Sequence, residues 1–242
     1  MKRPIIALDA DGVLLDYGAA YPHVWHRAFG VFPNERDPDA YWPIDRWDVE
    51  RLTGDRLDHF RSHFDDAFWS SIPALPGAIA ATQSLHDAGY ELVCVSALDV
   101  TFENARLRNL QNLGFPIEWV IATSSSEAGG NPKAPALGDL RPVAFVDDYL
   151  PYLADLPSSV HTALLRSHAV GSPNNGPRLQ EVSSHHEDLA AFAQWWLEER
   201  QTNSSKTRAG SLIERRANSM STDADEPSGT QSRAVTAIPS HR

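Results

Sequence analysis

Five short, continuous apolar runs divide this 242-residue chain as far as residue 165. They lie at residues 5–8, 91–96, 118–122, 142–146 and 160–165. Apolar and polar side chains do not alternate within them, which is typical of parallel strands covered by helices on both faces. Helical patterns at residues 77–88 and 100–113 lie between the first three runs and end at Gly89 and Gly114. The pattern predicts an α/β fold with a Rossmann-like, doubly wound parallel sheet.

The segments outside this alternation predict an insertion, one more helix and a tail. Residues 17–71 contain no convincing strand but hold 12 of the chain's 22 aromatic residues, which indicates a small helical insertion. Most of these rings are expected to pack together, and some could stack on a planar ligand. A helix is expected from Ser184 to about Arg200, with Glu187 completing a capping box. Residues 201–242 are rich in Ser, Thr, Arg and Asp, and a disordered tail is expected there.

The formal net charge of −11 limits the partners that the chain can bind. Nucleic-acid polymers require a positive surface, so we expect no binding to them. A small anionic substrate remains compatible if a local cation offsets the acids. No apolar run approaches the ~18 residues that cross a membrane, and the N-terminal stretch is too short for a secretion signal. With Cys94 as its single cysteine, the chain is expected to be a soluble cytoplasmic protein; no pattern indicates its oligomeric state.

Acidic and hydroxyl side chains stand where the predicted strands end. Asp9 and Asp11 follow the first apolar run. Ser96 ends the second run, and Asp147-Asp148 follow the fourth. Residues i and i+2 of an extended chain point to the same side, and Gly12 permits a tight turn directly afterwards. Because ligands of open α/β sheets bind beyond the carboxyl ends of the strands, these groups are expected to share one crevice. Neighbouring carboxylates suit a hard cation such as Mg²⁺, which would offset their repulsion.

These residues resemble a known set of motifs. Asp9-Ala10-Asp11-Gly12-Val13, Ser96, Lys133 and Asp147-Asp148 are similar, in this order, to the four motifs of the haloacid dehalogenase-like (HAD) hydrolase superfamily. The resemblance spans about residues 4–170. It implies a catalytic core of residues 1–16 and 72–200, with a small α-helical cap at residues 17–71. The cap and the stretch 68–77 also resemble, more loosely, the 5′(3′)-deoxyribonucleotidase branch.

The resemblance implies chemical roles for the acids. Asp9 would be the nucleophile that forms an aspartyl-phosphate. Asp11 would protonate the leaving alcohol and then deprotonate the attacking water. Mg²⁺ would be bound by Asp9, Asp147 and the backbone carbonyl of Asp11.

The other motif residues would hold the phosphate or support the site. Ser96 would donate a hydrogen bond to a phosphoryl oxygen, and Lys133 would place a positive charge beside it. Asp148 would orient Lys133 or support the metal site, and Gly12 would shape the turn. Two simpler alternatives stay open: Ser96 as an ordinary loop hydroxyl, and Lys133 as a solvated lysine among Gly and Pro residues. Lys133 is nevertheless the only lysine of the predicted core apart from Lys2.

The predicted function is a Mg²⁺-dependent phosphatase for a small phosphomonoester, with a nucleoside monophosphate ahead of a sugar phosphate or phosphoglycolate. The resemblance implies that Asp11 favours a phosphatase, since the dehalogenases of that superfamily lack an acid two residues after the nucleophile. Residues 17–71 contain no lysine, which argues against the Schiff-base chemistry of phosphonate hydrolysis. Two alternatives stay open: phosphotransfer to an acceptor other than water, and a catalytically silent relative that serves as a binding module.

Overall fold

The computed structural model describes residues 2–124, 130–165 and 170–199. The described residues as far as Leu197 belong to one compact unit. The expected tail, residues 201–242, lies outside the described residues, and its disorder stays a prediction. Within the described ranges, no helix has the length and apolar character needed to cross a membrane.

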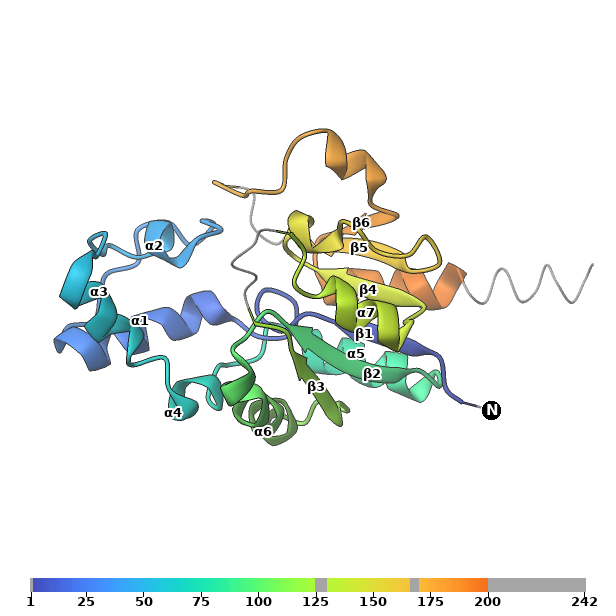
Figure 1. Ribbon diagram of the computed structural model, residues 1–242, viewed down its shortest axis with the longest axis horizontal. Helices are drawn as coiled ribbons and strands as arrows, with labels where there is room; N and C mark the ends of the chain where they lie inside the picture. The colour runs from blue at the N-terminus through green and yellow to red at the C-terminus, as the bar shows by residue number, and fades with distance from the viewer. Residues whose placement is uncertain (1, 125–129, 166–169, 200–242) are drawn as a thin grey trace, which may run out of the picture. The chain divides into compact units, whose positions relative to one another are not determined.

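A parallel sheet of six described strands forms the centre of the unit, in the order β3-β2-β1-β4-β5-β6 (Figure 1). The strands are β1 Ile5–Leu8, β2 Glu91–Ser96, β3 Trp119–Ala122, β4 Ala144–Asp147, β5 His161–Leu165 and β6 Ser184–His186. The chain winds outward from β1 in both directions, which is the doubly wound arrangement. The predicted α/β, Rossmann-like fold is therefore confirmed, and each of the five expected strands lies within two residues of its expected bounds.

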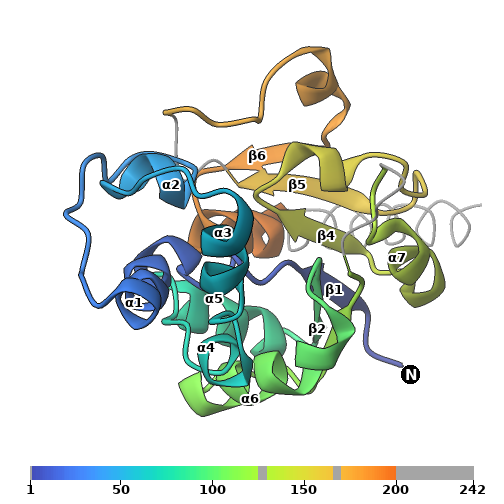
Figure 2. The ribbon, with the colours of Figure 1, turned by 60° about the vertical axis from the view of Figure 1, so that its left-hand side comes forward.

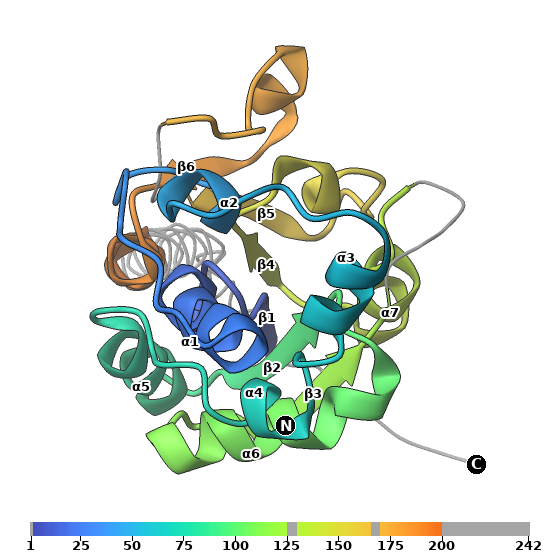
Figure 3. The same cartoon turned by 90° about the vertical axis from the view of Figure 1, so that its left-hand side faces the viewer.

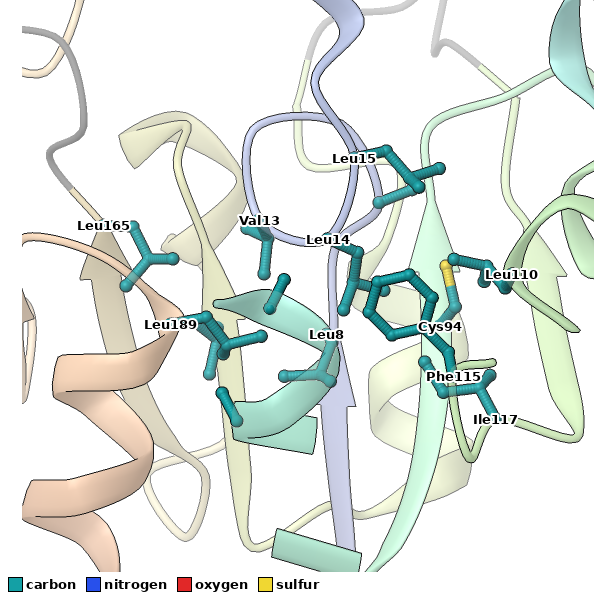
Figure 4. Close-up of a cluster of buried hydrophobic side chains, with 14 of the residues drawn as sticks. Leu8, Val13, Leu14, Leu15, Cys94, Leu110, Phe115, Ile117, Leu165 and Leu189 are labelled. Carbon is teal, nitrogen blue, oxygen red and sulfur yellow. The ribbon is translucent and has the colours of Figure 1, made fainter. Parts of the chain in front are cut away.

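Helices cover both faces of the sheet. They are α5 Ala78–Asp87, α6 Glu103–Leu113, α7 Ala134–Leu140 and a last helix that starts at Leu189. On one face, Leu8 of β1 belongs to an apolar cluster that includes Leu110 of α6 and Leu189 (Figure 4). On the other face, Ala7 belongs to a second cluster that includes Leu137 of α7. Because neighbouring strand residues enter different clusters, the strands are apolar at every position.

Four helices follow β1 and occupy the segment that the sequence predicts as a cap. They are α1 Tyr17–Phe29, α2 Pro43–Arg46, α3 Gly54–Arg61 and α4 Asp66–Trp69. They lie on the side of the sheet toward which the strands run (Figure 1), and Figures 2 and 3 turn this side toward the viewer. Their aromatic rings pack together: Phe60 has its ring centroid 5.4 Å from that of Tyr21 and 5.1 Å from that of Phe64. Tyr21 and Phe60 belong to the same apolar cluster as Leu8 of β1, so these rings extend the core that covers this face of the sheet.

The region around Ser184 differs from the prediction. Ser184–His186 pair with β5 as a strand instead of forming the first turn of a helix. The Ser184 hydroxyl lies within hydrogen-bond distance of two imidazoles, at 2.8 and 2.9 Å, and caps no helix. Asp188 takes that role: its carboxylate accepts a 2.8 Å hydrogen bond from the amide three residues on, and the helix starts at Leu189. The predicted capping box with Glu187 is wrong because a better acceptor follows it and β5 offers an unpaired edge.

Candidate active site

The loop after β1 turns back directly beyond the strand. The Ala10 carbonyl accepts hydrogen bonds from the amides of Leu14 and Leu15 at 2.8 and 2.9 Å, and both leucine side chains are buried in the core (Figure 4). Gly12 has a φ of +85°, in the left-handed region that glycine adopts without strain. A Cβ atom added there would lie 2.2 Å from Oδ2 of Asp148. The missing side chain therefore allows the loop after β1 to approach the loop after β4.

Lys133 lies completely buried at the start of α7, between two of the predicted site acids. Its Nζ is 2.6 Å from Oδ1 of Asp9 and donates a 2.7 Å hydrogen bond to Oδ2 of Asp147. Burial alone would lower the pKa of this ammonium group, but the charges of Asp147 and Asp9 raise the pKa above its usual value. Lys133 is therefore charged and held in place, and the alternative of a solvated loop lysine is excluded.

The acids around Lys133 carry more charge than it can neutralise. Carboxylate oxygens of Asp9, Asp147 and Asp148 lie within 4.8 Å of one another. Burial raises the pKa of Asp147 to about 7; Lys133 opposes this shift, and Asp9 adds to it. Burial and the charges of Asp147 and Asp9 raise the pKa of Asp148 well above its usual range. Oxygen donors at this spacing, with a net negative charge away from water, fit a hard divalent cation.

The Asp11 carboxylate contacts α6 instead of this cluster. Nη2 of Arg106 donates a 2.8 Å hydrogen bond to its Oδ2. Burial raises the pKa of the Asp11 carboxyl above its usual value, and the charge of Arg106 offsets only part of that rise. Arg106 belongs to no motif and is not among the site residues predicted from the sequence. The available signal was its position on the predicted helix, four residues before the apolar Leu110 and thus on the inner face.

A pocket of about 340 Å³ opens beside these acids. Loops at the strand ends contribute Asp9, Asp11, Ser96 and Asp148 to its lining. Its aromatic lining residues are Tyr17, Tyr41, Trp42, Tyr149 and Tyr152. The described chain thus brings the first two motifs and part of the fourth to one cavity, while Lys133 reaches this cavity through its contact with Asp9.

Sequence comparisons find no matching protein-family model and no significant match among curated proteins, but solved structures align along most of the chain. A HAD family hydrolase from Deinococcus radiodurans R1, with bound phosphate and sodium, aligns at a TM-score of 0.51 and 15% identity, covering 78% of this chain and 93% of that one. A predicted phosphoglycolate phosphatase from Haemophilus somnus 129PT aligns at 0.54 and 15%, covering 80% and 98%. An L-2-haloacid dehalogenase aligns at 0.50 and 14%, covering 81% and 100%. The chain has the HAD-like fold of these structures.

The alignments confirm the fold that the motif resemblance implied, and at 14–15% identity they show the fold alone. The narrower resemblance to the 5′(3′)-deoxyribonucleotidase branch is not confirmed. Since a phosphatase and a dehalogenase both align with the chain at low identity, the HAD-like fold does not determine the reaction. The reaction has to be inferred from the side chains at the pocket, and Asp11 is the residue on which a phosphatase and a dehalogenase would differ.

Proposed function

We propose that this protein is a Mg²⁺-dependent phosphatase that hydrolyses a small phosphomonoester through an aspartyl-phosphate on Asp9. The observation that carries the proposal is the Asp11 carboxyl, which lines the same pocket as Asp9 and has a raised pKa. An alcohol leaves as an alkoxide unless an acid protonates it, whereas a halide leaves without a proton. A carboxyl beside the nucleophile, with its pKa raised by burial, is suited to supply that proton and therefore favours phosphate-ester cleavage.

The residues act in two steps. An Asp9 carboxylate oxygen attacks phosphorus, the bond to the leaving oxygen breaks, and Asp11 gives its proton to that oxygen. Asp11 then removes a proton from a water molecule, whose oxygen attacks phosphorus and releases inorganic phosphate and free Asp9. Lys133 holds Asp9 in place through its 2.6 Å contact, and Ser96 donates a hydrogen bond to a phosphoryl oxygen.

The acidic cluster fits the divalent cation that this chemistry uses. Asp9 and Asp147, together with the backbone carbonyl of Asp11, would hold Mg²⁺, while Asp148 would support them. When bound, the ion would neutralise charge on the transferring phosphoryl group. Gly12 contributes by letting Asp148 approach, because any larger residue would collide with its carboxylate.

The pocket lining favours a substrate with one phosphate and an uncharged, planar remainder, such as a nucleoside monophosphate. Tyrosine and tryptophan rings form much of the lining, and such rings stack on planar groups. Arg46 is the only cationic side chain among the described lining residues. Its Nε donates to Glu35 at 2.8 Å, and its Nη1 lies 3.7 Å from Asp16, so its charge is already offset. A second anionic group would find no free cation there.

Phosphoglycolate is the second candidate substrate, because its carboxylate could displace Glu35 from Arg46. A sugar phosphate would need neither the rings nor Arg46. These choices concern the leaving group alone, and the chemistry at Asp9 and Asp11 is the same for each.

A panel of phosphomonoesters tests the proposal. Purified protein is assayed for release of inorganic phosphate from nucleoside monophosphates, sugar phosphates, phosphoglycolate and p-nitrophenyl phosphate, with Mg²⁺ or with EDTA. We expect Mg²⁺-dependent release that is fastest with a nucleotide. Asp9→Asn should reduce the rate by about 10⁴-fold or more, as loss of a nucleophile does. Asp139→Asn, on the exposed side of α7, should leave it unchanged. An inert wild-type protein, or an Asp9→Asn variant with the wild-type rate, would refute the proposal.

The same panel separates the alternatives. Adding alcohols or sugars as acceptors would divert phosphate from water if the protein is a phosphotransferase. A binding module would release no phosphate from any ester.

A further inference from the structure

Arg106 is one of only two completely buried cationic side chains among the described residues, the other being Lys133. It lies in α6, outside every recognised motif. Its Nη2 donates to Oδ2 of Asp11, and this is its only ion pair among the described residues. Its Nε and Nη1 are buried and have no hydrogen-bond partner in the described chain.

This arrangement is unfavourable for stability. A buried guanidinium loses hydration, and each buried N–H group left unpaired adds a further cost in free energy. A buried methionine at the same place would fill a similar volume without either cost. Arg106 gains two contacts in return, the hydrogen bond to Asp11 and a contact with the Trp69 ring, and only the first of them reaches a predicted site residue.

The neighbours of Arg106 restrict its own movement. Its guanidinium carbon lies 5.1 Å from the ring centroid of Trp69, in a cation–π contact. The Trp69 ring stacks on Tyr17, with centroids 6.1 Å apart and planes at 18°, and its Nε1 donates to the Phe64 carbonyl at 3.0 Å. A ring held on two sides fixes the plane of the guanidinium, and the guanidinium restricts rotation of the Asp11 carboxyl.

We propose that Arg106 is a positioning residue for the proton transfer that Asp11 performs. This inference rests on the proposed phosphatase function. Arg106 does not itself line the pocket, and among the described residues its side-chain hydrogen bond goes to Asp11 and not to the acids of the metal cluster. It therefore affects the step that protonates the leaving oxygen, and has little effect on the attack by Asp9.

Leaving groups of different acidity distinguish positioning from general support of the fold. p-Nitrophenolate departs without a proton, whereas an alkoxide requires one. The ratio kcat/KM reports the steps as far as departure of the leaving group, so it isolates this proton transfer from later attack by water. The two substrates are p-nitrophenyl phosphate and the alkyl monoester that the panel shows to be turned over fastest, both with saturating Mg²⁺.

Arg106→Met is expected to reduce kcat/KM for the alkyl monoester by about 10²-fold, the lower end of what general acid catalysis contributes. For p-nitrophenyl phosphate the loss should be several-fold at most. Arg106→Lys, which keeps a positive charge, should recover part of the alkyl activity. Arg108→Met is the matched control, because Arg108 lies on the same helix and bonds Asp66 of α4 at 2.6 Å, but is half exposed. It should leave both activities unchanged.

If the Arg106 variants lost kcat/KM equally for both substrates, the inference would be overturned, and Arg106 would only stabilise the fold. Arg106→Lys gives the same comparison if Arg106→Met does not fold. In an Asp11→Asn background, Arg106→Met should cause no further loss, and an additional loss there would also overturn the inference. A wild-type protein that cleaves no phosphomonoester would refute the proposed function instead, so the two failures are distinguishable.

Discussion

At the scale of single residues, the Asp148 carboxylate occupies the space that a side chain at position 12 would need. A Cβ at Gly12 would meet Oδ2 of Asp148 at 2.2 Å. Gly30, at the end of α1, has a similar backbone conformation, with φ +76° against +85° at Gly12. A Cβ at Gly30 would meet nothing within 4 Å. Both positions therefore favour glycine because of their positive φ, but only at position 12 would a side chain also collide with a neighbouring residue.

We expect Gly12→Ala to reduce the phosphatase rate by about 10²-fold, because it displaces Asp148 and the acids beside it by about 1 Å. Gly30→Ala carries the same backbone strain of about 1–2 kcal/mol. It should lower the midpoint of urea unfolding and leave the Mg²⁺-dependent rate unchanged. Phosphate-release assays and urea unfolding of both variants check this. Equal loss of activity in the two variants would show that strain, and not the contact with Asp148, is responsible.

At the scale of elements, the start of the last helix gives a direct test of helix capping. Asp188→Ala should reduce the free energy of unfolding by about 1 kcal/mol, because it removes the acceptor for an otherwise unpaired amide of the first turn. Glu187→Ala should have no effect, since Glu187 is exposed and precedes the cap. Urea unfolding of both variants measures the difference. If Glu187→Ala reduced the free energy of unfolding more than Asp188→Ala does, the result would support the capping box expected at Ser184.

The same region shows why some elements could be predicted from the sequence and β6 could not. Strands β1 to β5 pack on both faces, so their apolar character is visible in the sequence alone. Strand β6 is the three residues Ser184–His186 at the edge of the sheet, and none of them is fully buried. Its conformation depends on the open edge of β5, which is a tertiary effect that no local pattern carries.

The candidate site was predictable to a similar extent. Ser96 and Asp147 end two parallel strands of one sheet, and Asp9 directly follows a third, so topology alone brings them to the same edge. The burial of Lys133 between two acids was not predictable, because its local sequence reads as a loop. Arg106 contacts a residue 95 positions away, and a single arginine on an amphipathic helix gives no indication of such a partner.

At the scale of the whole described unit, the proposed Mg²⁺ site would couple cation binding to stability through its buried acids. Asp147 has a pKa of about 7, against a usual value of 3.8, because burial disfavours its charged form. A raised pKa means that the folded protein binds this proton more tightly than the unfolded chain does. The free energy of unfolding that it contributes is thus complete below about pH 4, and is lost as the pH rises to about 7.

Without divalent cations, we therefore expect the Tm to fall between pH 5 and pH 8. Mg²⁺ should raise the Tm more at pH 8 than at pH 5, because the ion binds the ionised carboxylate and competes with the proton. Asp147→Asn removes the titration of Asp147 and leaves that of Asp148, so it should weaken the pH dependence and abolish most of the response to Mg²⁺. Thermal unfolding of both proteins, with EDTA or Mg²⁺ at each pH, measures these shifts. An equal response to Mg²⁺ at both pH values, retained in Asp147→Asn, would place the cation away from the cluster of Asp9, Asp147 and Asp148.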